Sequence, residues 1–303
     1  MSAEHFWDRE VVAPTHTSWM EHPRVREFIL RSIARDEHGL WPVDWFMRWL
    51  SGRRFERALS IGCGTGPFER DVVRKDLVAR IDAFDGSTNS LRIAQESARA
   101  EGMASRVRYF AADFNVTSLP RNTYDIVFIH QALHHVAALE RLLRDVMLAL
   151  KPGGILYLDE YIGPSRCDWN DRLIAPHRRL FASLPAEARR TPALAWPIQA
   201  DDPSEAVRSS EIMARLRIGF DVREIRGYGG NFLSVLYPAV NFDRAPDALE
   251  TVIAEEEKVL EGGDMPYYAV IVATPKQGPP QRLASVRYRA GAATRGLLFR
   301  LKH

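Results

Sequence analysis

The chain has 303 residues, of which 46% are hydrophobic and 26% are charged. This composition is typical of a globular protein with a large core, and it excludes collagen-like, low-complexity and disordered classes. No apolar run reaches the roughly 18–20 residues of a membrane span, and two cysteines are too few for a disulfide scaffold. Because residues 1–10 are polar and acidic, we expect no secretory signal and a cytoplasmic location.

The formal net charge of +2 conceals an asymmetry along the chain. Lys and Arg number 41 against 39 Asp and Glu, but residues 276–303 hold seven of these bases and no acid. A basic tail therefore follows an acidic body. We expect this tail to be a solvated or frayed terminus, with weak contact to a membrane surface as the alternative. We expect no nucleic-acid partner.

The first part of the sequence predicts two helices. Apolar residues recur at helical spacing over residues 23–38 and again over residues 41–50, and each stretch has a proline near its start. We interpret residues 1–54 as a helical cover that precedes the main domain.

From residue 57 onward, short apolar runs alternate with helical stretches. Strands are expected over residues 58–61, 79–84, 107–111, 124–129, 154–158, 221–228 and 267–273. This alternation predicts an α/β fold, with a mainly parallel sheet and helices on both faces. Such sheets bind ligands at the carboxyl ends of their strands, near the point where the strand order reverses.

Two insertions interrupt this alternation. Residues 163–207 contain six prolines, and their tryptophans need burial, so we expect an irregular insertion with short helices. Residues 231–265 look helical. We predict that the two insertions form a lid over the acceptor, and that residues 55–275 are one elaborated domain.

A glycine-rich loop follows the first predicted strand. Gly62, Gly64 and Gly66 allow a sharp turn and a close approach of the backbone to a ligand. The dinucleotide fingerprint would place its last glycine at position 67, where the chain has Pro67, and this argues against a nicotinamide cofactor. Within the loop, Cys63 is interpreted as a small packing residue and not as a nucleophile.

Carboxylates follow the next two predicted strands. Asp85, followed by Gly86, is suited to accept hydrogen bonds from ribose hydroxyls. Asp113 and Phe114 pair a carboxylate with an aromatic face, which suits the amino group and ring of an adenine.

These features, together with residues 124–136 and 150–156, resemble class I S-adenosylmethionine (SAM)-dependent methyltransferases. The resemblance is strong over residues 55–160. Two further segments, 159–166 and 202–208, are similar to bacterial members often associated with glycan or natural-product pathways. The resemblance implies a Rossmann-like, doubly wound sheet of seven strands whose last strand is antiparallel.

The same resemblance implies where SAM binds. The glycines would lie along its methionine part, the two carboxylates would hold the ribose and the adenine amino group, and the fourth strand would end near the methionine. The cofactor-binding residues so implied are Gly62, Cys63, Gly64, Gly66, Asp85, Gly86, Asp113, Phe114 and His130.

Five residues at the same edge are candidates for catalysis. His130, His134 and His135 are candidate general bases, because histidine titrates near neutral pH. The alternative for the histidines is local hydrogen bonding at a helix start. Glu160 and Tyr161 follow the fifth strand and either orient the acceptor or support its neighbours. We expect no metal, because no cysteine or carboxylate accompanies the histidines at a familiar spacing.

Another set is expected to contact the acceptor. Trp7 and Trp19 belong to the N-terminal cover, and Tyr228 either shapes the pocket or ends a strand. Arg166 and Arg208 either clamp a carboxylate or phosphate of the acceptor or form internal ion pairs.

The sequence therefore predicts in-line methyl transfer from SAM to a small-molecule or glycan acceptor, at a hydroxyl or carboxylate oxygen. A general base is needed only for a hydroxyl or a protonated amine. The alternatives are a nicotinamide-dependent oxidoreductase and a SAM-binding scaffold without catalysis. The oligomeric state is left open.

Overall fold

The computed structural model describes residues 18–276, so Trp7 and the tail after Lys276 lie outside the described residues. One seven-stranded sheet has the order β3-β2-β1-β4-β5-β7-β6. The strands are β1 (Phe55–Ile61), β2 (Val78–Asp85), β3 (Val107–Ala111), β4 (Tyr124–His130), β5 (Leu150–Tyr161), β6 (Phe220–Gly229) and β7 (Tyr268–Pro275). The β7 strand is antiparallel to both of its neighbours, and β1 to β5 are parallel. The predicted fold class is confirmed.

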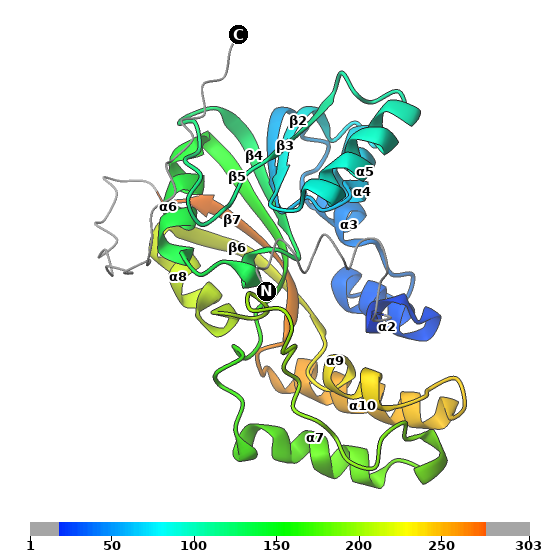
Figure 1. Ribbon diagram of the computed structural model, residues 1–303. Coiled ribbons are helices and arrows are strands. Elements are labelled where there is room, and N and C mark those ends of the chain that lie inside the picture. The colour runs from blue at the N-terminus through cyan, green and yellow to red at the C-terminus, as the bar shows by residue number, and fades with distance from the viewer. Residues whose placement is uncertain (1–17, 277–303) are drawn as a thin grey trace.

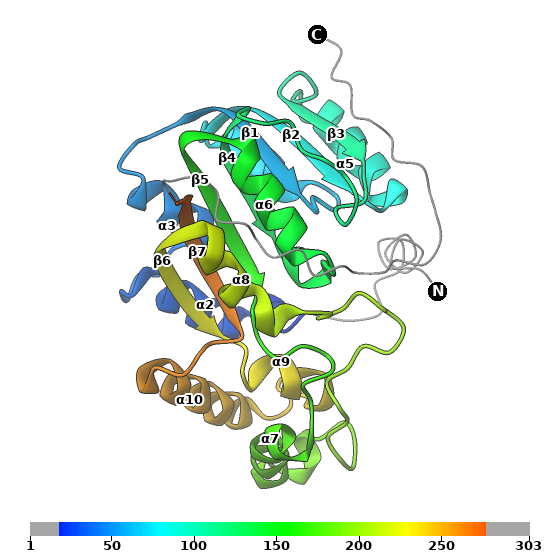
Figure 2. The same ribbon diagram turned by 90° about the vertical axis from the view of Figure 1, so that its left-hand side faces the viewer.

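The sheet is covered on both faces, which explains why its strands are almost continuously apolar. Successive side chains of β4 point to opposite faces. Ile126 and Phe128 join one apolar cluster, whereas Val127 and Ile129 join the other. Figures 1 and 2 show the two helical layers. The first layer contains α2 (Pro23–Ala34), α3 (Pro42–Trp49), α4 (Pro67–Arg74) and α5 (Thr88–Ala100), and the second contains α6 (Leu139–Ala149) and α8 (Ile212–Gly219).

The helices that precede β1 are part of the core. Val25, Ile33 and Phe46 are fully buried and belong to the same apolar cluster as the strands, and α2 contacts β6. Helices α2 and α3 therefore contribute to the core of the domain.

The insertion over residues 163–207 is more regular than we expected. It contains α7 (Asp171–Ser183), a helix of 13 residues that continues past Pro176. The side chain of Asn170 caps this helix by accepting hydrogen bonds from the backbone N–H groups of Arg172 and Leu173. A cap and a buried apolar face outweigh the one helical hydrogen bond that an internal proline removes.

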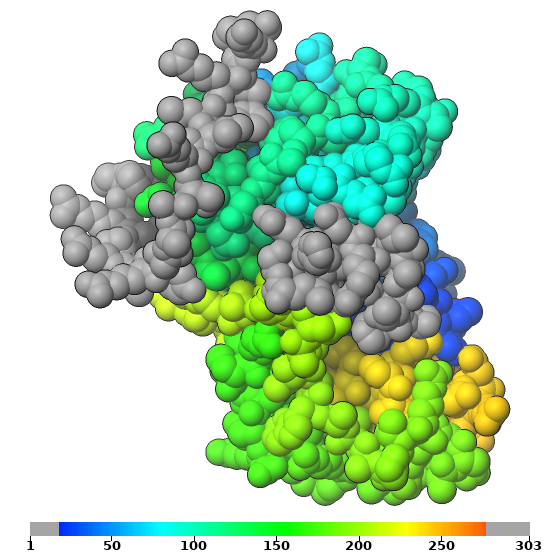
Figure 3. All heavy atoms as spheres, in the orientation of Figure 1, coloured from blue at the N-terminus to red at the C-terminus, as the bar shows by residue number. Residues whose placement is uncertain are grey.

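Both insertions lie beyond the carboxyl ends of the parallel strands. The second contains α9 (Leu233–Leu236), the short helix η5 (Tyr237–Ala239) and α10 (Pro246–Gly262). The α9 helix contacts both α7 and α10, and Figure 3 shows these segments as one continuous body at the lower end of the molecule. Among the described residues, none of the helices is both long and apolar enough to cross a membrane.

The strand order places a ligand crevice beside β1. The chain leaves β1 for β2 on one side, and β4 lies on the other side. The loops after β1 and β4 therefore diverge and open the crevice in which sheets of this type bind their ligands.

Candidate active site

The three glycines after β1 all have positive φ angles, which glycine adopts without strain. A Cβ atom on Gly62 would lie 2.3 Å from the Cβ atom of Ala132, and one on Gly66 would lie 2.2 Å from the hydroxyl of Tyr109. A Cβ atom on Gly64 would meet nothing within 4 Å. Gly62 and Gly66 therefore permit close packing, while Gly64 faces open space at the crevice.

Asp85, at the end of β2, fixes this loop. One of its carboxylate oxygens accepts a hydrogen bond of 2.8 Å from the N–H of Gly64, and the other accepts one of 2.8 Å from the N–H of Ser87. Gly86 lies between Asp85 and Ser87, just after the end of β2. Beside the loop, burial raises the pKa of the Cys63 thiol well above its ordinary value, and Glu69 adds to the effect. A protonated buried thiol fits the packing role predicted for Cys63.

The loop after β3 lies next to the Asp85 loop, because Asp85 pairs with Ala111 in the sheet. Asp113 is exposed and accepts a hydrogen bond of 2.7 Å from the N–H of Asn115. Phe114 is half-buried and packs near Phe84, with ring centroids 6.4 Å apart. Open space at the glycine loop, two strand-end carboxylates and a partly exposed aromatic ring fit the amino-acid, ribose and adenine parts of SAM.

His130 ends β4 on the far side of the glycine loop. Its ring stacks on Phe68, with centroids 5.1 Å apart, and its side chain is 42% exposed. The Nε2 atom lies 3.6 Å from the carboxylate of Asp159. That carboxylate is buried and accepts hydrogen bonds of 2.6 Å from the hydroxyl of Tyr228 and 3.4 Å from the amide of Gln131. Burial raises the pKa of Asp159, while His130 and Tyr228 act against this shift.

An apolar cavity of about 220 Å³ lies over this group. Helices α2 and α3 form much of its wall, and His130, Asp159 and Tyr228 line it from the sheet. Its lining comprises Met20, Arg26, Ile29, Leu30, Trp41, Pro42, Val43, Phe68, Asp71, His130, Asp159 and Tyr228. The sequence singled out His130 and Tyr228 but not Phe68 or Asp159. An aspartate within a buried strand gives no signal of its own until the strand's neighbours are known.

Glu160 is fully buried and saturated with hydrogen bonds. It accepts bonds of 2.9, 2.6 and 2.7 Å from the N–H groups of Ala132, Leu133 and Tyr161. It also contacts Nδ1 of His134. These contacts leave Glu160 no position from which to deprotonate an acceptor, and they favour the alternative that it supports its neighbours.

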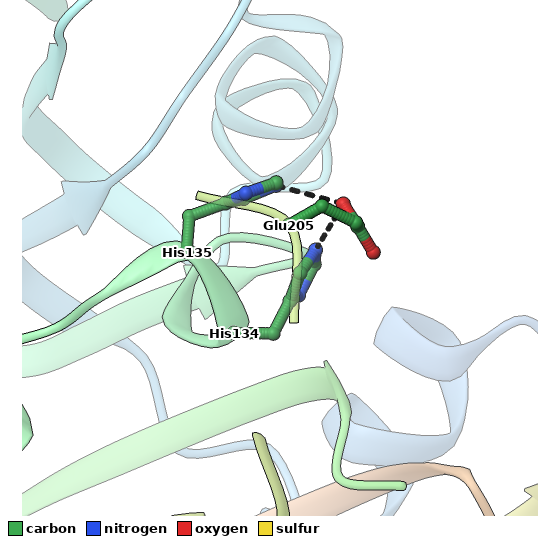
Figure 4. A group of neighbouring side chains, drawn as sticks. All are labelled: His134, His135 and Glu205. Atoms are coloured by element: carbon green, nitrogen blue, oxygen red, sulfur yellow. Dashed lines mark ion pairs between the residues drawn. The ribbon is translucent and has the colours of Figure 1, made fainter. Parts of the chain in front are cut away.

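His134 and His135 lie in the short helix η2 (Leu133–His135) and are both buried. Burial disfavours the charged form of His134, but the carboxylates of Glu160 and Glu205 outweigh it and raise the pKa to about 9. Burial and the charge of His134 hold the pKa of His135 well below its ordinary value. Glu205 belongs to the first insertion and faces both imidazoles (Figure 4). Of the three histidines, the structure therefore leaves His130 as the accessible candidate base.

The residues expected to contact the acceptor fall in different places. Trp19 is buried against Tyr268, with ring centroids 5.2 Å apart. Arg208 donates hydrogen bonds of 2.7–2.9 Å to Glu140 and Glu211, so it forms the internal ion pairs that were the alternative to clamping an acceptor.

Arg166 and Tyr161 line a second cavity of about 120 Å³, beside the first insertion. The guanidinium of Arg166 donates a hydrogen bond of 2.9 Å to the carbonyl of Asp202. The hydroxyl of Tyr161 donates one of 2.9 Å to the carbonyl of Pro164. Both side chains are thus tied to the insertion itself.

Comparison with known proteins identifies the central part of the chain. Residues 59–158 match the family model described as a methyltransferase domain. A sterol 24-C-methyltransferase of Aspergillus fumigatus is 27% identical over 150 residues, which cover 50% of this chain and 37% of that protein. A ubiquinone/menaquinone biosynthesis C-methyltransferase of Azotobacter vinelandii is 35% identical over 133 residues, which cover 42% of this chain and 51% of that protein. The alignments thus span between about a third and a half of these relatives.

Two solved structures share the fold over almost the whole chain. The cyclase SpnF covers 92% of this chain and 98% of its own, with a TM-score of 0.52 and 18% identity. A phosphoethanolamine N-methyltransferase of Haemonchus contortus, solved with S-adenosylhomocysteine, covers 93% of this chain and 61% of its own, with a TM-score of 0.52 and 19% identity. At this identity the likeness concerns the fold alone.

The strand order, the glycine loop at the switch point and the family match agree with one another. Residues 59–158 of this chain match a methyltransferase domain, and the seven-stranded sheet has the Rossmann-like fold of the class I SAM-dependent enzymes.

Proposed function

We propose that the protein transfers a methyl group from SAM to an oxygen of a small, largely apolar acceptor. The observation that carries this proposal is the apolar cavity, whose floor is formed by His130, Asp159 and Tyr228 at the end of β4 beside the glycine loop. A cavity of about 220 Å³ suits part of a small molecule better than a chain of sugars, which needs many polar partners. A glycan acceptor, as in the bacterial subgroup that the sequence resembles, is therefore the less favoured alternative.

SAM, when bound, supplies a methyl group that its sulfonium has already activated. In our proposal Gly62, Gly64 and Gly66 lie along its methionine part. Asp85 accepts hydrogen bonds from its ribose, Asp113 accepts one from its adenine amino group, and Phe114 packs on the adenine ring. Helices α2 and α3, which form much of the cavity wall, would exclude water from the reacting groups, and alignment is then the main task of the protein.

His130 is proposed as the general base for a hydroxyl acceptor. It is the one catalytic candidate of the sequence that both lines the cavity and is partly exposed within the described residues. Proton uptake makes its ring positively charged, and Asp159, 3.6 Å from Nε2, stabilises that charge. Tyr228 and Gln131 hold the Asp159 carboxylate in position.

The relatives point to the same acceptor class but not to the same atom. Two of them are named for carbon methylation, one of sterols and one in ubiquinone/menaquinone biosynthesis, and a fold neighbour is named for nitrogen methylation. The sequence matches cover about half of this chain, so they do not extend over all of the segments that build the cavity. Methylation at oxygen therefore rests on His130 and on the resemblance, and the product must be analysed chemically.

Calorimetry with SAM and with NAD tests the cofactor. We expect SAM to bind and NAD not to bind. Asp85→Asn, which keeps the side-chain shape but removes the charge, should weaken SAM binding at least tenfold, because hydrogen bonds to charged groups contribute about 1.5–3 kcal/mol. Asp221→Asn, at the exposed far edge of the sheet on β6, is the matched control and should bind SAM like the unaltered protein. Binding of NAD alone would refute the proposal.

Transfer is then tested by supplying SAM with a labelled methyl group and an apolar metabolite extract from a host that lacks the gene. The label should appear in one small molecule that accumulates unmethylated in that host, and mass spectrometry should place it on oxygen. Binding of SAM with no transfer to any component would favour a non-catalytic role. A label on carbon or nitrogen would retain the enzyme class and reject the acceptor atom.

A further inference from the structure

Two imidazole nitrogens and one carboxylate oxygen converge outside the proposed methyl-transfer site. The Nε2 atom of His134 lies 3.7 Å, and that of His135 3.8 Å, from the same Oε2 atom of Glu205. The three ligand atoms lie within 4.8 Å of one another. Figure 4 shows the two rings turned toward the Glu205 carboxylate, which comes from a different part of the chain.

From this geometry we infer that His134, His135 and Glu205 bind one divalent transition-metal ion of the Zn²⁺ type. Such ions hold imidazole nitrogens and carboxylate oxygens at about 2.0–2.2 Å, so that tetrahedral ligand atoms stand about 3.3–3.5 Å apart. The observed distances to Oε2 exceed this range by a few tenths of an ångström. Glu205 has the freedom to close that gap, because its side chain is 29% exposed and belongs to a loop.

The other ring nitrogens have the partners that metal-binding histidines need. Nδ1 of His134 contacts Glu160, and Nδ1 of His135 lies 3.1 Å from the hydroxyl of Ser204. Histidine ligands almost always use their second nitrogen in this way, because the bond fixes the tautomer and aims the free nitrogen at the metal. Both rings are therefore held with Nε2 toward Glu205.

The charge around the two rings also favours a cation. Asp202 is fully buried, and its Oδ2 atom, 3.7 Å from Nδ1 of His135, has no hydrogen-bond partner among the described residues. Glu160 and Glu205 add two more carboxylates to the same small region. The other oxygen, Oδ1, accepts hydrogen bonds from the N–H and the hydroxyl of Ser204. A buried carboxylate oxygen without a partner is costly, and a dication nearby offsets that cost.

The ion would fasten the first insertion to the sheet. His134 and His135 follow β4 directly, whereas Glu205 lies near the end of the insertion, beside the cavity lined by Tyr161 and Arg166. This inference revises our expectation that no metal binds. Local spacing in the sequence does not reveal such a site, because Glu205 is 70 residues away from His135, the nearer histidine.

Metal titration of the tag-free, chelator-treated full chain tests the site without any assay of methyl transfer. Calorimetry with ZnCl₂ should give one ion per chain, and titration with Co²⁺ should produce visible absorption bands with an imidazole and carboxylate ligand set. His135→Gln and Glu205→Gln should each weaken Zn²⁺ binding by at least tenfold and remove the Co²⁺ bands. His38→Gln is the matched control, because His38 is an exposed histidine that lies 3.7 Å from a carboxylate oxygen of Glu37. This variant should bind Zn²⁺ like the unaltered protein.

Limited proteolysis provides a second readout. Zn²⁺ should slow cleavage within residues 163–207 of the unaltered protein and of His38→Gln, but not of Glu205→Gln, whose fold is checked by circular dichroism. No saturable Zn²⁺ binding, or unchanged binding in His135→Gln and Glu205→Gln, would overturn the inference. Neither result depends on SAM, so failure of the metal site and failure of the proposed methyl transfer are distinguishable.

Discussion

At the scale of single residues, the proposed chemistry depends on which polar groups are already engaged. Glu160 and His134 hold each other and the backbone around them, whereas His130 keeps a partly exposed ring over Asp159. Sequence alone ranked these residues together because all follow strand ends. Only the structure separates the occupied groups from the available one.

Replacing His130 tests its role as a base. His130→Gln should lower kcat by about 10²–10⁴ for a hydroxyl acceptor, the usual contribution of a positioned general base. KM should change little, because the apolar wall of the cavity remains. Steady-state kinetics with the identified acceptor measures both constants. If kcat stays within threefold of the unaltered enzyme, proton removal by His130 is excluded.

Glu69, beneath the glycine loop on α4, should make stability depend on pH. Burial raises its pKa from 4.5 to about 6, against the effect of the hydrogen bond from Ser60. Between these values the folded chain keeps a proton that the unfolded chain has lost. The stabilisation present below about pH 4.5 is therefore lost as the pH rises through 6, and it amounts to about 2 kcal/mol.

Glu69→Gln should remove this dependence. The free energies of unfolding of the variant and of the unaltered protein are measured in urea without ligand, and the second is subtracted from the first. This difference should be more positive at pH 8 than at pH 4.5, by up to about 2 kcal/mol. Glu96→Gln, an exposed residue paired with Arg92 at 2.9 Å, serves as the control and should follow the unaltered protein at both pH values. An identical difference for Glu69→Gln at both pH values would show that the residue does not titrate in this interval.

At the scale of elements, one side of α2 serves both the core and the cavity. Ile33 is fully buried in the core beneath the sheet, whereas Leu30 is half-buried and lines the apolar cavity. One helix thus both stabilises the domain and shapes the proposed acceptor site. Its amphipathic pattern predicted the helix but not that part of its buried side would line a cavity.

The fully buried Ile33 and the cavity-lining Leu30 should respond differently to truncation. Ile33→Ala should lower the free energy of unfolding by about 2–5 kcal/mol, as buried large-to-small changes do. Leu30→Ala should cost less stability and instead raise KM for the acceptor with little change in kcat. Urea unfolding and steady-state kinetics on the same two variants separate the effects. If Leu30→Ala lost as much stability as Ile33→Ala and left KM unchanged, the cavity would not be the acceptor site.

At the scale of the whole molecule, the positions of the strands and of most helices along the chain were predictable, because hydrophobic periodicity reports burial directly. The glycine loop and the strand-end carboxylates were also found, since their positions follow from the parallel sheet. The partnership of His134 with Glu205 was not predictable, because it depends on how an insertion folds back. The wall of the cavity was missed for the same reason. Much of the wall comes from α2 and α3, which the sequence predicted only as a helical cover.

The position of β7 in the sheet also has a consequence for the order in which the molecule is built. Among the described strands, β6 is joined to the rest of the sheet only through β7. On a ribosome the first five strands and the glycine loop emerge early and are free to pair, but β6 must wait for residues 268–275. The hydrogen bond between Tyr228 and Asp159 therefore forms late. A nascent chain can acquire the cofactor side of its crevice well before the acceptor side exists.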